Sequence, residues 1–110
     1  MDAHARSQLV LDWQNHHACL SGDAVLLILG AADDAELSVQ RTFTSKNHAR
    51  IERRKDDFVL VDNSTNGTFV QTEDERITFL RRGEMRLWGS GWISLGEPLT
   101  SEAAIRFENV

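Results

Sequence analysis

The sequence has little of what disulfide-linked or membrane-spanning proteins need. Its 110 residues include one cysteine, one proline and no tyrosine. Because a single thiol cannot form an internal disulfide, the fold must be stabilised by a packed core. Cys19 itself is expected to be a small buried side chain. The longest apolar run, at 24–29, is far too short to cross a bilayer. With no signal peptide apparent, we expect a cytoplasmic location and no membrane partner.

Positive charge is also in short supply. Twelve lysines and arginines stand against 17 aspartates and glutamates, which gives a net charge of −5. Non-specific binding of nucleic acid depends on a basic surface, so we expect no nucleic-acid partner. A local basic pocket is compatible with this balance.

Helical periodicity is missing. No long stretch carries an apolar stripe with a helical period, whereas short segments rich in Val, Ile, Leu, Phe and Thr alternate with glycines. This rhythm predicts an all-β fold, either a sandwich or a barrel. The expected strands are 9–13, 18–20, 25–29, 37–39, 49–54, 58–62, 68–71, 77–80, 85–87, 92–95 and 105–108.

The clearest hairpin runs from 49 to 62 and turns at 55–57. Arg53, Arg54 and Lys55 form a basic cluster at its tip, for which a solvated surface is favoured over a docking patch. The segment from Trp88 to Trp92 resembles a second, shorter hairpin. Tryptophans more often pack than bind ligands, but an exposed pair would be a candidate partner surface.

Two polar motifs flank the hairpin. The first is TSKNHARI at 44–51, and the second is DNSTNGTFV at 62–70, where Asn-Gly supplies the positive φ angles of a tight turn. In this order they resemble the signature of forkhead-associated (FHA) domains, S-(R/K)-x-H-A followed by D-x-S-x-N-G-T-(F/Y)-V. Gly30, fifteen positions before Ser45, and the segments 80–84 and 93–96 also fit. The sequence of these segments is particularly similar to that of FHA domains attached to bacterial adenylate or guanylate cyclases.

The resemblance implies an eleven-stranded, two-sheet β-sandwich at 9–110 with its binding loops at one end, preceded by a tail or linker at 1–8. It also implies a signalling module that binds phosphothreonine peptides. The expected peptide-binding residues are Ser45, Lys46, Thr65 and Asn66, with Arg41 and Asn47 as auxiliary residues. The residues expected to hold the site in shape are Gly30, His48, Gly67 and Thr68. Converging hydroxyl, ammonium and amide donors are what a phosphate dianion and a peptide backbone require.

One position departs from the family pattern. Gly30 is followed by Ala31, where the family usually places an arginine that grips the phosphate. Two functions therefore stay open. The chain is either a phosphothreonine reader with a weakened pocket, or a domain for phospho-independent protein interaction or oligomerisation.

Catalysis and metal binding are disfavoured. No carboxylate or oxyanion glycine motif accompanies Ser45 and His48, so a hydrolase is not expected. The adjacent His16 and His17 have no further ligand at a metal-like spacing and are expected to be solvent-facing loop histidines. We expect neither a metal nor another cofactor.

Overall fold

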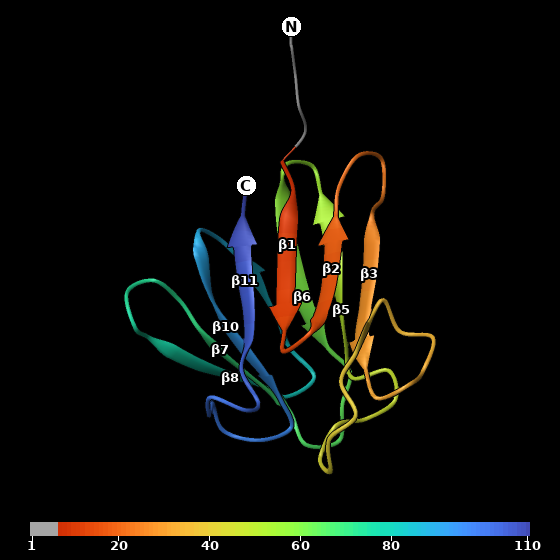
Figure 1. The fold of residues 1–110 in the computed structure, drawn as a ribbon. Helices are drawn as coiled ribbons and strands as arrows, with labels where there is room; N and C mark the ends of the chain where they lie inside the picture. The colour runs from red at the N-terminus through yellow and green to blue at the C-terminus, as the bar shows by residue number, and fades with distance from the viewer. Residues whose placement is uncertain (1–6) are drawn as a thin grey trace, which may run out of the picture.

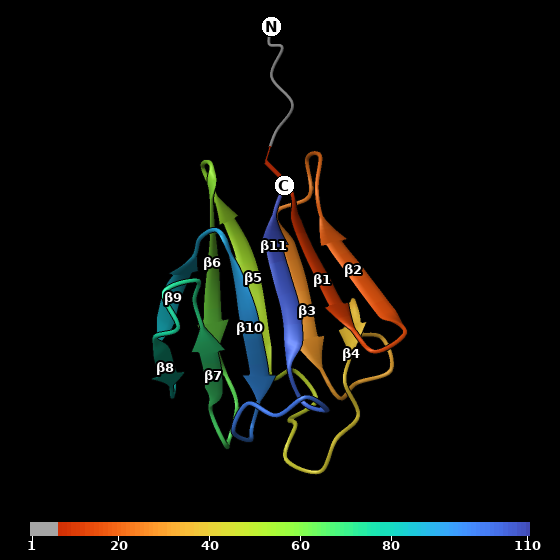
Figure 2. The ribbon, with the colours of Figure 1, turned by 60° about the vertical axis from the view of Figure 1, so that its left-hand side comes forward.

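Two β-sheets packed face to face make up the structure, a computed structural model that describes residues 7–110 (Figures 1 and 2). One sheet has the strand order β2 (His16–Leu20), β1 (Leu9–Trp13), β11 (Ile105–Asn109), β10 (Ser90–Leu95), β7 (Thr68–Gln71) and β8 (Ile77–Leu80). The other has the order β4 (Leu37–Ser38), β3 (Leu26–Gly30), β5 (Ala49–Arg54), β6 (Asp57–Asp62) and β9 (Glu84–Leu87). The prediction of an eleven-stranded β-sandwich is confirmed.

Alternation of side chains builds the core between the sheets. In β1 the odd-numbered residues from Leu9 to Trp13 are buried while the even-numbered ones are half-buried, and β5 and β11 begin with the same pattern. A strand with one face on the core has this period of two residues. Phe58 and Phe107 are the largest fully buried side chains. Within residues 7–110 no helix is long and apolar enough to cross a membrane.

The basic cluster at the β5–β6 turn is only partly solvated. Arg54 lies on the surface between Glu52 and Glu84, as expected. For Arg53 the prediction is wrong, because its side chain is buried. Its guanidinium lies 4.8 Å from the centre of the Phe58 ring, and its Nε donates a hydrogen bond to the Ala24 carbonyl at 3.1 Å. Arg53 therefore closes the core beneath the β2–β3 turn.

Three further expectations fail for local reasons. Cys19 is exposed, because β2 is an edge strand and Cys19 lies on its outer face. His16 and His17 are exposed as expected, but they belong to β2 and not to a loop. The segment Trp88–Trp92 is not a hairpin, since β9 and β10 belong to different sheets. It crosses from one sheet to the other, and both of its tryptophans are about two-fifths exposed.

The long connections gather at one end of the sandwich. In Figures 1 and 2 the loops after β3, β4, β6 and β10 lie at the bottom, away from Val110 at the top. β1 begins at Leu9, and Gln8 exchanges two backbone hydrogen bonds with Val110. Residues 1–6 of the predicted tail lie outside the described residues. The two polar motifs both fall in the loops at the end of the sandwich opposite Val110.

Candidate functional site

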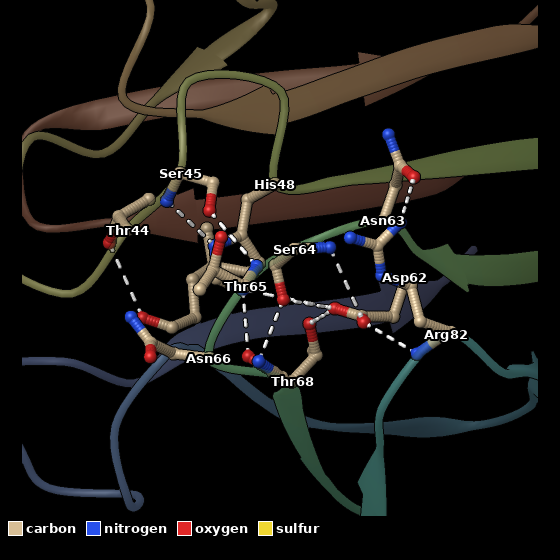
Figure 3. A network of polar contacts seen from close by, with 12 residues as sticks. Thr44, Ser45, His48, Asp62, Asn63, Ser64, Thr65, Asn66, Thr68 and Arg82 are labelled. Carbon is tan, nitrogen blue, oxygen red and sulfur yellow. Dashed lines mark hydrogen bonds and ion pairs between the residues drawn. The ribbon is translucent and has the colours of Figure 1, made fainter.

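His48 joins the two loops that carry the polar motifs (Figure 3). Its ring is fully buried, its Nδ1 accepts the backbone N–H of Ser45 at 3.0 Å, and its Nε2 lies 2.7 Å from the Gly67 carbonyl oxygen. Because Nδ1 accepts a hydrogen bond and Nε2 faces a carbonyl oxygen, the ring is neutral and carries its proton on Nε2. Burial lowers the pKa of His48 and keeps this neutral form. The β4–β5 loop is thereby fixed to the β6–β7 loop.

Asp62 shapes the second loop from its base. One carboxylate oxygen accepts the hydroxyls of Ser64 and Thr68, each at 2.7 Å, and the other accepts the backbone N–H of Arg82 at 2.9 Å. Burial alone would raise the pKa of Asp62, but these donors outweigh it and lower the pKa. Ser64 in turn accepts the backbone N–H of Gly67 at 2.7 Å. The loop is thus wrapped around a buried, fully bonded carboxylate.

Two glycines at the site have neighbours close to the place of a side chain. Gly67 has φ +85°, and a Cβ there would lie 2.3 Å from the Phe79 ring. A Cβ on Gly30 would lie 1.9 Å from the Lys46 carbonyl oxygen. A side chain at Gly30 would meet backbone, and one at Gly67 would be strained by the positive φ and would have to displace the Phe79 ring. Directly after Gly30, the backbone N–H of Ala31 donates to the Ser45 carbonyl oxygen at 2.9 Å.

The candidate peptide-binding residues lie on the outside of this framework. The backbone N–H of Thr65 donates to the Ser45 hydroxyl at 3.3 Å, so the hydroxyl proton of Ser45 stays available. Asn66 donates through Nδ2 to the Phe43 carbonyl at 3.2 Å, which leaves its Oδ1 as an acceptor. Lys46 is exposed, and its ammonium makes no ion pair with residues 7–110. The side chains of Thr65 and Asn47 are also exposed.

Arg41, expected as an auxiliary residue, is engaged elsewhere. Its guanidinium contacts Glu97 in two places, with Nε at 2.6 Å from Oε2 and Nη2 at 3.1 Å from Oε1. The pair lowers the pKa of Glu97, mainly through the hydrogen bond from Arg41. Glu97 belongs to the β10–β11 loop, so this pair ties a third loop to the same end of the sandwich. The guanidinium of Arg41 is therefore paired with Glu97.

The arrangement suits binding and not nucleophilic catalysis. Both ring nitrogens of His48 are occupied by backbone groups, so His48 cannot take the proton of the Ser45 hydroxyl. Within residues 7–110, no group of three or more His, Cys, Asp or Glu side chains could hold a metal ion.

Sequence reasoning found the exposed residues but missed part of their support. The sequence places Asp62 and Ser64 in the second motif without a role of their own, although both are buried. The signal was present, because Asp and Ser two residues apart are able to bond to each other and to the backbone. The contribution of Arg82 is a backbone N–H, which no residue type reveals.

Comparison with known proteins supports the same family. The family model described as FHA domain matches residues 27–85, more than half of the chain. No curated protein matches the sequence.

Several solved structures share the fold. The FHA-1 domain of Rv1747 from Mycobacterium tuberculosis is 18% identical, with a TM-score of 0.75, over 96% of this chain and 98% of that one. The FhaA FHA domain, complexed with the intracellular domain of Rv3910, is 25% identical, with a TM-score of 0.65, over 93% and 99%. The N-terminal FHA domain of S. cerevisiae Rad53p, in complex with a phosphothreonine peptide, is 17% identical, with a TM-score of 0.69, over 94% and 91%.

Proposed function

This chain belongs to the FHA domain family, and we propose that it is a protein-interaction module that binds phosphothreonine peptides at the loops following β4 and β6. The observation that carries the proposal is the contact between these loops. Ser45 and Thr65 meet through a hydrogen bond, and His48 fixes the loops from below. Relatives of similar fold were solved with a phosphothreonine peptide and with a protein domain.

Each exposed residue has a defined part in this proposal. The hydroxyls of Ser45 and Thr65 and the ammonium of Lys46 donate to the phosphate, because a dianion needs several converging donors with at least one charge. The Asn66 amide contacts the peptide backbone. Asn47 lies beside Lys46 and can add a contact to the peptide.

The phosphate pocket is proposed to be weak, because Ala31 supplies no guanidinium beside Ser45. The turn after it also carries Asp33 and Asp34, both exposed, whose charge opposes a phosphate. Lys46 would then be the main cation facing the ligand. We expect affinity for phosphopeptides that is modest and sensitive to salt.

A phospho-independent interaction or oligomerisation domain is the second candidate. The same alanine favours it, together with the exposed Trp88 and Trp92. Neither proposal involves catalysis, a cofactor, nucleic acid or a membrane. A cytoplasmic location and the narrower likeness to cyclase-attached FHA domains remain predictions.

Titration of matched peptides tests the proposal. Fluorescence anisotropy would compare a degenerate phosphothreonine peptide library with its unphosphorylated form. We expect a preference for the phosphorylated library that Lys46→Ala removes. Lys55→Ala, at the β5–β6 turn, is the matched control, because Lys55 is the only other lysine in the chain. Equal binding of both libraries by the unaltered protein would favour the phospho-independent function.

A further inference from the structure

β8 is an edge strand whose outer side is open. It pairs with β7 on one side and ends the six-stranded sheet on the other. The backbone N–H of Thr72 donates to the Arg76 carbonyl across the β7–β8 turn. Hydrogen-bonded and non-bonded pairs alternate along an antiparallel ladder, so the N–H and C=O groups of Ile77 and Phe79 point away from β7. These four groups can accept another strand.

The side chains of the same two residues are apolar and exposed. Ile77 is 56% exposed and Phe79 is 48% exposed, and the Phe79 ring lies 4.8 Å from that of Phe69. One edge strand of the other sheet, β9, instead exposes Glu84 and Arg86. Charged side chains are the usual protection of a free edge against pairing. β8 lacks that protection within the strand.

Charges of opposite sign flank β8. Asp74, Glu75 and Arg76 precede the strand with a net negative charge, and Arg81 and Arg82 follow it. An antiparallel partner brings the start of one strand beside the end of the other. If the partner is a second copy, related by a two-fold axis through Thr78, Ile77 lies opposite Phe79 and the net negative end lies beside the basic end.

We propose that this chain forms a homodimer in which β8 pairs with β8 of a second copy around Thr78. In this register the two outward-facing residues pair with each other, because Ile77 of each copy exchanges backbone hydrogen bonds with Phe79 of the other. Beyond the strand, it also brings Glu75, in the β7–β8 turn, towards Arg81 of the other copy. The contact is small compared with a standard interface, so the dimer is weak and concentration-dependent. The dimer does not depend on phosphopeptide binding.

Charge reversal tests the register. The side chains of Glu75 and Arg81 make no hydrogen bond or ion pair with residues 7–110, so Glu75→Arg and Arg81→Glu should both fold. Each variant places like charges opposite each other twice per dimer, and we expect association to weaken about tenfold or more. A mixture of the two variants restores both opposite-charge pairs, so it should associate as the unaltered protein does.

Sedimentation velocity from about 1 µM to about 1 mM, the range of weak association, measures all of these samples. Lys55→Glu, which makes the same charge change as Arg81→Glu at a distant turn, should dimerise normally. Circular dichroism confirms that each variant is folded. The proposal is overturned if the unaltered chain stays monomeric, which would leave the edge to an extended segment of another protein. It is also overturned if the mixture associates no better than either variant alone.

Discussion

Replacing Ala31 by arginine tests whether the phosphate pocket is intact apart from one missing side chain. The backbone N–H of Ala31 donates to the Ser45 carbonyl at 2.9 Å, and that of Ala32 donates to the Lys46 carbonyl at 3.2 Å. Residue 31 is therefore anchored beside the loop that carries both candidate donors. An arginine there starts within reach of a phosphate bound between Ser45 and Thr65. Its guanidinium can form two parallel hydrogen bonds to phosphate oxygens.

The size of the gain follows from the charge and from its neighbours. Hydrogen bonds to charged groups contribute about 1.5–3 kcal/mol, which corresponds to roughly ten- to a hundredfold in affinity. Asp33 and Asp34 lie in the adjoining turn and are exposed, so they compete for the new guanidinium. We therefore expect Ala31→Arg to raise affinity for phosphothreonine peptides by about tenfold, the lower end of this range.

Isothermal titration calorimetry with phosphorylated and unphosphorylated peptides would measure this gain. It should appear only with the phosphorylated peptide, and it should shrink from 0.1 to 1 M salt, as the screening length falls from about 10 to about 3 Å. Ala24→Arg, in the exposed β2–β3 turn at the far end of the sandwich, controls for added charge. If Ala31→Arg folds normally and still does not prefer phosphothreonine, the remaining donors do not converge on a phosphate.

Three other substitutions test the framework beneath the site. Gly67→Val should lower the free energy of unfolding by about 1–3 kcal/mol, because it strains a positive φ and meets the Phe79 ring; unchanged stability in urea would contradict this loop geometry. His48 has a lowered pKa, so its stabilisation is present above its unfolded-state pKa and is lost as the pH falls. His48→Ala should lower the free energy of unfolding at pH 8. It should also reduce the loss of stability between pH 8 and about 5, the range around the ordinary histidine pKa, as measured by urea titration. Asp62 also has a lowered pKa, so its stabilisation is lost in acid as the pH falls through the folded-state value. Asp62→Asn should cost about 1.5–3 kcal/mol at pH 7, and equal stability of both proteins there would show that the carboxylate does not hold the loop.

Strand positions could be predicted from the sequence because burial alternates along them. All eleven expected segments overlap observed strands, and the bounds of β1, β5, β7 and β8 agree residue by residue. Glycine and polar turn residues separate the strands, so a period of two and its interruptions are visible without the fold. The hairpin predicted at 88–92 was wrong because the same turn residues suit both a hairpin and a crossing between sheets. Pairing partners decide between them, and they are not local.

Interactions between distant residues were beyond sequence reasoning. Arg41 and Glu97 are separated by 56 positions, and nothing in either local segment marks them as partners. Arg53 was placed in solvent by its charge, yet a ring and two carbonyl groups cover it. Long side chains can bury their apolar part and still satisfy the charged group locally. Whether such a side chain is buried depends on the residues that pack around it, and these cannot be identified from a single sequence.

The division between buried and exposed polar residues has a consequence for how recognition can vary. Thr68 donates to Asp62, and His48 is bonded to the backbone on both sides, so the loops are held from inside without a ligand. Lys46 and Thr65 face outward, and their side chains support no other part of the fold. Substitutions in the outer set should therefore change affinity without changing stability. At position 31 only the backbone N–H bonds to the site, by donating to the Ser45 carbonyl, so an alanine there removes a phosphate ligand and leaves the framework bonds in place.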